Sequence, residues 1–190
     1  AIRSISNSVS ETQLIIGDVD ETDTIEEISL KVMSETNLQL LDGESIFKGD
    51  VVLSGDSNIR LDTSIAANQS SGIMLPGIGT GTVTVNNVYY LNSSSVWTLT
   101  DADSTTNSIN LIAYANSTGT GSTNRMVLQG IVFDSAHGFA VGAPLYLRTT
   151  PGALTTTVPV GSNDVARVVG YAITADEIYF KPDNTWVKIA

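Results

Sequence analysis

Apolar residues occur in short runs through the last third of the chain, residues 138–190, and turn-forming residues separate the runs. This pattern predicts antiparallel strands joined by tight turns. The segment 150–152, Thr-Pro-Gly, predicts a sharp reversal, because proline fixes φ at about −65° and glycine accepts a positive φ. The most apolar run, residues 165–173, predicts a strand covered on both faces, with Arg167 as its one charged residue.

The same alternation extends back to residue 83. Ile178 and Phe180 are two positions apart and are expected to share one strand face, with Tyr179 on the other. We predict one helical turn within the polar loop 101–108 and a flexible polar loop at 116–124. Residues 83–190 are therefore predicted to form a C-terminal antiparallel β-barrel or sandwich domain, with earlier strands at 83–91, 96–99, 109–115 and 126–133.

A segment rich in glycine and small polar residues, 66–82, precedes this domain and is predicted to be a linker. It contains Gly-x-Gly-x-Gly at residues 77–81. A dinucleotide fingerprint would lead into a helix and a P-loop would continue with Lys-Ser/Thr, whereas here a strand is predicted next. We therefore expect no phosphate site at these glycines.

The first 65 residues are expected to form an extended arm (1–16) and a short-strand β region (17–65). Residues 24–33 fit either a helix, through a Thr-x-x-Glu capping box, or a strand, through apolar alternation; strand is favoured because the neighbouring chain is predicted to be β. Gly43, Gly49 and Gly55 are six residues apart, which is compatible with stacked short strands or with ordinary hairpins. The whole chain is thus predicted to be all-β.

Charge is distributed unevenly along the chain. The net charge of the 190 residues is −11, which argues against nucleic acid and anionic membrane surfaces as direct partners. Residues 1–62 hold 13 acidic and 4 basic residues, whereas residues 63–190 hold 7 and 5. The acidic first third either complements a basic surface of a larger assembly or serves solubility. No apolar run approaches the roughly 20 residues that span a bilayer and no signal peptide is evident, so synthesis in a cytoplasm is expected.

The one histidine and the absence of cysteine restrict the possible chemistry. Without cysteine there is no disulfide or thiolate, and zinc would need several His or Cys ligands. Asp134 and Ser135 lie close to His137 in sequence, but adjacent residues of an extended chain point to opposite faces. A histidine in a turn is therefore favoured over a catalytic one.

Acidic clusters are the remaining candidates for a site. Residues 18–23 begin like a calcium-binding loop, but the sixth position is Asp23 instead of glycine and the twelfth is Ser29 instead of glutamate. Carboxylate pairs that glycoside hydrolysis would need fall in predicted turns, where carboxylates are common for backbone reasons; they are Asp101 with Asp103 and Asp176 with Glu177. We therefore expect no enzyme activity, no metal and no cofactor.

Packing and turn residues of the C-terminal domain resemble those of a known family. The matching segments are Val88–Leu91, Val96–Ala102, Gly142–Leu147, Pro151-Gly152, Asp164–Tyr171 and Ile178–Trp186. Together they resemble a β-domain that recurs in virion proteins of tailed bacteriophages, among them capsid decoration (cement) proteins and fibre or spike proteins. The resemblance covers about residues 86–190 and transfers no active site.

The resemblance implies a homotrimer on the outer capsid surface of a virion, bound to the major capsid protein. The alternative is a tail fibre, spike or head-fibre component that binds a host-surface glycan or protein through loop 116–124 and exposed aromatic residues. The acidic N-terminal region (residues 1–62) is expected to bind the capsid subunits. Candidate contacts with sister copies or the capsid are Ile2, Ile5, Val9, Leu14, Ile15, Ile16, Tyr146, Tyr171, Tyr179 and Trp186.

Overall fold

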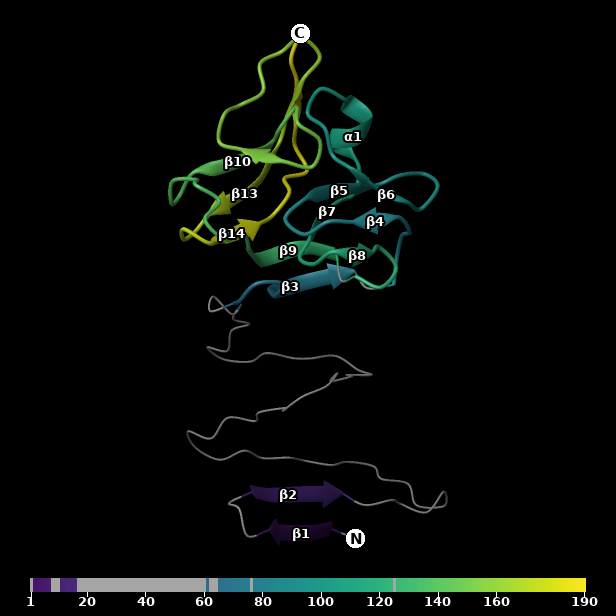
Figure 1. Cartoon of the computed structure of the whole chain (residues 1–190), viewed down its shortest axis with the longest axis vertical. Helices are drawn as coiled ribbons and strands as arrows, with labels where there is room; N and C mark the ends of the chain where they lie inside the picture. The colour runs from purple at the N-terminus through teal and green to yellow at the C-terminus, as the bar shows by residue number, and fades with distance from the viewer. Residues whose placement is uncertain (1, 8–10, 17–60, 62–64, 76, 125) are drawn as a thin grey trace. The chain divides into compact units, whose positions relative to one another are not determined.

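The computed structural model describes residues 2–7, 11–16, 61, 65–75, 77–124 and 126–190 (Figure 1). The chain divides into two compact units, Ala1–Ser54 and Gly55–Ala190. Three predictions lie outside the described residues: the acidic cluster 18–23, the ambiguous segment 24–33 and the glycine spacing between residues 43 and 55. The predicted contact at Val9 also lies outside them.

The described part of the first unit is a β-hairpin. Strand β1 (Ile2–Asn7) pairs antiparallel with β2 (Glu11–Ile16), and Ile2 lies opposite Ile16. The same register places Ile5 opposite Gln13, Leu14 opposite Ser4 and Ile15 opposite Arg3. The segment predicted as an extended arm is therefore extended, but its two halves pair with each other.

The second unit is a nearly all-β domain. Its elements are β3 (Ser70–Leu75), β4 (Thr82–Val83), β5 (Val88–Leu91), β6 (Trp97–Leu99), α1 (Thr105–Ile109), β7 (Ile112–Ala115), β8 (Gly119–Thr120), β9 (Met126–Phe133), β10 (Pro144–Leu147), β11 (Leu154–Thr155), β12 (Val165–Ala166), β13 (Val168–Ala172), β14 (Glu177–Phe180) and β15 (Val187–Lys188). The predicted strand 126–133 is confirmed at both ends, and α1 confirms a helical turn in the polar loop after β6.

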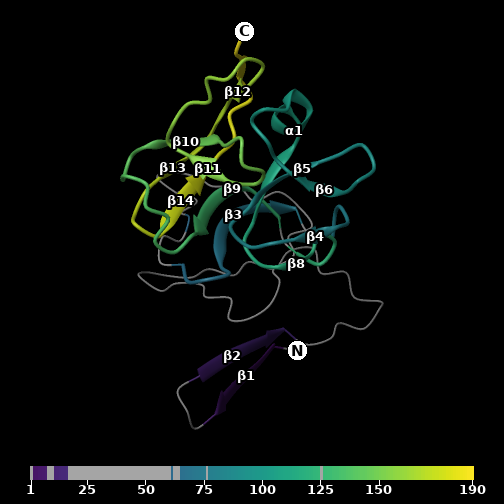
Figure 2. The same ribbon diagram turned by 45° about the horizontal axis from the view of Figure 1, so that its top comes forward.

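A curled antiparallel sheet holds the domain together. Its strands follow the order β11-β10-β13-β14-β9-β7-β5-β6, and β3 also pairs with β9. Strand β3 follows β9 from Met126 to Val132, while β14 pairs with the end of β9 and β7 with its beginning. Since a strand has two hydrogen-bonding edges, β14 and β7 share the edge opposite β3. Strand β9 therefore joins two groups of strands, as Figures 1 and 2 show.

The linker predicted at 66–82 is wrong over Ser70–Leu75, because these residues are strand β3 of the sheet. Its Gly72 lies directly opposite Gly130 of β9, and both have positive φ, 152° and 156°. A Cβ on Gly130 would lie 2.2 Å from the carbonyl oxygen of Ser71. The two backbones can approach this closely only because neither residue has a side chain.

The predicted strand 165–173 is interrupted at Arg167. Val165–Ala166 pairs with β15, whereas Val168–Ala172 belongs to the large sheet between β10 and β14. The Arg167 side chain is buried against three backbone carbonyls, and this role separates the two strands. In Figure 1 the C-terminus lies at one end of the second unit and β3 at the opposite end, and Figure 2 shows β12 beside the C-terminus.

Two apolar clusters form the core of the second unit. The larger contains Leu145, Leu147, Ile178 and Phe180, all fully buried, together with Tyr114, whose ring centroid lies 5.7 Å from that of Phe180. The predicted shared face of Ile178 and Phe180 is thus confirmed. The smaller cluster surrounds the buried Trp97, whose Nε1–H donates to the carbonyl of Ile78 at 2.8 Å. The predicted reversal at 150–152 is also confirmed, with Gly152 at a φ of 77°.

Candidate binding surface

Three of the predicted contact residues lie together on the outer face of the large sheet. Tyr171 of β13 is directly opposite Tyr179 of β14. Tyr146 of β10 stands between the buried Leu145 and Leu147, so its side chain points to the face away from the core. These three tyrosines form what we call the tyrosine face, in which Tyr171 is 43% exposed and the other two are half-buried.

The tyrosine face is held in place by its neighbours. The side-chain amide of Gln129 on β9 donates to the hydroxyl of Tyr179 at 3.2 Å. Tyr179 is also opposite the buried Ile131, and Tyr171 is opposite the exposed Pro144. The rings therefore stand on paired strands, so their positions depend on the sheet register and not on a loop.

Trp186, the fourth aromatic candidate, lies elsewhere. It precedes β15, which pairs with β12 in a separate two-stranded sheet, and it is 41% exposed. Side chains at Ile2, Ile5, Leu14, Ile15 and Ile16 belong to the first unit, for which the structure describes only the strand pairing. The structure thus brings Tyr146, Tyr171 and Tyr179 together but does not bring Trp186 to them.

A hollow of about 280 Å³ adjoins Tyr171. Lys181, Asp183 and Asn184 line it together with Val168 and Pro182. The Asp183 carboxylate accepts a 2.9 Å hydrogen bond from the backbone N–H of Thr185, and this bond lowers the pKa of the Asp183 carboxyl. An aromatic ring, an ammonium, a carboxylate and an amide are therefore within one small region of the surface.

Arg167 is a second feature of this surface. Its side chain is 5% exposed and donates from Nε to the carbonyl of Asp183 at 2.7 Å. Its Nη1 donates to the carbonyls of Ser108 at 2.7 Å and Asn110 at 3.2 Å. Burial lowers the pKa of this guanidinium, and the negative Asp183 opposes that effect. The Arg167 guanidinium thus links the end of α1 to the chain that precedes β13 and to the chain that follows β14.

A polar cluster surrounds Asp134, at the end of β9. Asn86 donates from Nδ2 to the Asp134 carboxylate at 2.8 Å. The buried Tyr114 hydroxyl lies near enough to this carboxylate to interact electrostatically, but no well-formed hydrogen bond joins them. Asn86 Oδ1, Tyr114 Oη and His137 Nε2 are the described buried side-chain atoms without a hydrogen-bond partner. Burial raises the pKa of the Asp134 carboxyl, and nearby His137 opposes the rise.

The raised pKa of Asp134 predicts a pH effect on stability. The folded state favours the protonated carboxyl, so ionisation at neutral pH costs folding free energy, and this cost disappears below the unfolded pKa of about 3.9. Asp134→Asn keeps an acceptor for Asn86 without the charge. We expect it to raise the urea midpoint at about pH 7, with the difference shrinking toward about pH 3. Asp134→Ala, which removes the acceptor, is expected to lower the midpoint; an Asn variant less stable than wild type at neutral pH would contradict this account.

The residues considered for a catalytic triad, Asp134, Ser135 and His137, lie in the turn after β9. His137 Nδ1 accepts a 3.0 Å hydrogen bond from the backbone N–H of Phe139, and the two rings stack at 5.0 Å. Ser135 is exposed, and Asp134 bonds to Asn86 as described above. In the segments that the structure describes, no three His, Cys, Asp or Glu side chains gather as a metal site would require. No helix of the described segments is long and apolar enough to cross a membrane.

The loop predicted to be flexible, 116–124, has many internal bonds. Its residues 119–120 form β8, which pairs with β4. Asn124 donates from Nδ2 to the carbonyl of Ser117 at 2.7 Å and accepts from the Ser117 hydroxyl at 3.0 Å. The loop is therefore a hydrogen-bonded structure whose polar side chains bind one another.

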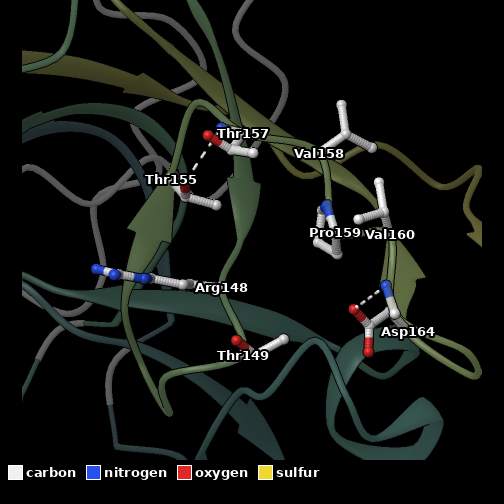
Figure 3. A pocket seen from close by; sticks show the side chains of 9 residues that line it. Arg148, Thr149, Thr155, Thr157, Val158, Pro159, Val160 and Asp164 are labelled. Carbon is white, nitrogen blue, oxygen red and sulfur yellow. Dashed lines mark hydrogen bonds between the residues drawn. The ribbon is translucent and has the colours of Figure 1, made fainter.

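A second hollow, of about 380 Å³, lies beside the β10–β11 hairpin (Figure 3). Thr155 and Thr157 stand on one side of it and Val158, Pro159 and Val160 on another, and the Arg148 guanidinium points away from Asp164. Two polar groups in its wall already have partners, since Thr155 accepts from the N–H of Thr157 and Asp164 from that of Gly161. Val160 is 80% exposed, so this end of the domain presents apolar surface.

These features describe an all-β module with a curled antiparallel sheet and an aromatic outer face. No protein-family model matches the chain, and no curated protein matches it significantly.

Proposed function

We propose that the protein is a structural component of a tailed-bacteriophage virion, namely a capsid decoration (cement) protein. The observation that carries this proposal is the tyrosine face, in which three aromatic residues stand on paired strands of the sheet and one of them is 43% exposed. Tyrosine is enriched at protein interfaces because it combines a large apolar ring with a polar end. The resemblance of residues 86–190 to phage virion β-domains supports the same conclusion.

In this proposal the protein acts as a homotrimer on the outer capsid surface. Each copy binds across neighbouring subunits of the major capsid protein and stabilises the shell by removing apolar surface from water. Such burial contributes about 25 cal/mol per Å² before the costs of association and ordering are subtracted. The net charge of −9 on residues 1–62 complements basic patches on the capsid, so the acidic N-terminal region is assigned to capsid attachment.

Removal of residues 1–62 tests this assignment. We expect the truncated protein to keep the cooperative unfolding of the second unit and to lose capsid binding, because most of the acidic residues are absent. The measurement is occupancy on empty shells, determined by co-sedimentation, with the full chain as control. Full occupancy by the truncated protein would show that the acidic region is not the attachment site.

A second candidate is a fibre or spike component that binds a host-surface glycan. It is favoured by the hollow beside Tyr171, since an exposed aromatic ring next to Lys181, Asp183 and Asn184 suits the apolar face and hydroxyls of a sugar. The copy number per virion separates the two candidates, with hundreds expected for a cement protein and a few dozen or fewer for a fibre. Binding on a glycan array that Tyr171→Ala abolishes would favour the fibre.

A further inference from the structure

A hollow of about 410 Å³ opens beside Arg167 on the outer surface of the second unit, and we call it the Arg167 pocket. Four separate segments form it: α1 with the chain that follows, β9, the residue between β12 and β13, and the chain after β14. Its lining residues are Ile109, Asn110, Leu111, Ile112, Leu128, Arg167, Pro182 and Asn184. The walls are therefore mainly apolar, with one cation and two side-chain amides.

The charge of Arg167 is incompletely compensated. Its three hydrogen bonds go to backbone carbonyls, which carry only partial negative charge. Within the described segments no carboxylate lies at ion-pair distance, and the nearby Asp183 carboxylate is exposed and bonded to Thr185. Arg167 as a whole residue is only 5% exposed, so its guanidinium has lost much of its hydration, and an anion that reached it would be bound strongly for its size.

One end of the guanidinium is available for such an anion. Nη2 donates no hydrogen bond to any described residue. The described side-chain atoms that are both buried and unpaired do not include Nη2, so Nη2 is not fully buried. Nη2 is therefore the end of the guanidinium that solvent reaches. Leu111 and Ile109, in the pocket wall, are 48% and 36% exposed, which leaves apolar surface uncovered beside the charge.

We propose that the Arg167 pocket binds the carboxylate of a glutamate or aspartate side chain that a partner protein presents next to an apolar residue. The carboxylate accepts from Nη2–H and supplies the missing negative charge, while the apolar neighbour covers Leu111 and Leu128. A phosphate is a poorer fit, because the walls are mainly apolar and a phosphate has no apolar group to cover them. The volume suits one or two side chains.

Titration of the ¹⁵N-labelled full chain with short peptides, followed by NMR, tests this proposal independently of any virion. The probes are N-acetyl-Ile-Glu-methylamide, its neutral Gln counterpart and inorganic phosphate. We expect the Glu peptide to shift the amide resonances of Leu111, Leu128 and Asn184 and to saturate with a dissociation constant on the order of 1 mM. The Gln peptide is expected to bind about tenfold more weakly or not at all.

Variants separate the pocket from general effects of charge. Arg167→Gln is expected to abolish the preference for the Glu peptide, and Arg167→Lys to retain part of it. Leu111→Ser leaves the cation in place, and the variant is expected to fold because Leu111 is 48% exposed. It is expected to weaken binding of the Glu peptide several-fold. Val160→Ser, on another surface, is expected to leave this binding unchanged. Equal binding of the Glu and Gln peptides, shifts caused by phosphate alone, or binding unaffected by Leu111→Ser would overturn the proposal.

Discussion

Gly130→Ala is expected to lower the free energy of unfolding of the second unit by about 4 kcal/mol, which is enough to unfold a marginal domain. The new Cβ would lie 2.2 Å from the carbonyl oxygen of Ser71 and 2.8 Å from the Cα of Gly72. Both contacts are with backbone, so β3 and β9 would have to separate where they now pair. The φ of 156° adds strain for any residue with a side chain.

Gly142→Ala provides the matched control. Gly142 also has a positive φ, 83°, but nothing lies within 4 Å of the position its Cβ would take. Gly142→Ala is expected to lower the free energy of unfolding by only about 1 kcal/mol, from backbone strain alone. Chemical denaturation of the two variants gives the comparison, and equal midpoints would show that the close approach of β3 and β9 contributes nothing to stability.

Phe180→Ala is expected to destabilise the second unit by about 3–5 kcal/mol. Its ring is fully buried in the larger cluster, in contact with the ring of Tyr114, and truncation would leave a cavity between β14 and β7. Tyr171→Ala is the control, because it removes another aromatic ring from the neighbouring strand but on the outer face, where it is 43% exposed. Tyr171→Ala is expected to lower the free energy of unfolding by less than about 1 kcal/mol.

Thermal and urea unfolding of both variants, followed by near-UV circular dichroism, measure this difference. A loss at Tyr171 as large as at Phe180 would mean that the outer face is packed against something within the monomer, and the tyrosine face would then be no binding surface. The comparison therefore tests which face of the sheet is exposed to solvent, as well as how much the core contributes to stability.

Local pattern was sufficient to predict the strands whose composition differs clearly from that of their flanks. Met126–Phe133 was predicted at both ends because a polar loop precedes it and a turn follows. The face shared by Ile178 and Phe180 followed from the two-residue period of a strand. These predictions needed no knowledge of what each strand pairs with.

The failures involve contacts between residues far apart in the chain. Ser70–Leu75 has the composition of a linker, and it is a strand because Gly72 meets Gly130 across the sheet. Local pattern predicts Arg167 as a charged residue within a continuous strand. It cannot predict the hydrogen bonds of Arg167 to the backbone carbonyls of Ser108, Asn110 and Asp183, because these depend on the tertiary fold. Tyr146, Tyr171 and Tyr179 were candidates by residue type, but only the strand register places them on one face.

Strand β9 has a consequence for how the second unit forms. Ser70 must wait for Val132, and Gly130 must wait for Phe180, so pairings on both edges of β9 connect distant parts of the chain. Loops of this size lose much conformational entropy before the contacts that close them form, which slows folding. On a ribosome, β3 would leave the exit tunnel long before its partner and would remain an exposed edge until β9 is synthesised, which makes this interval the one in which a chaperone is most useful.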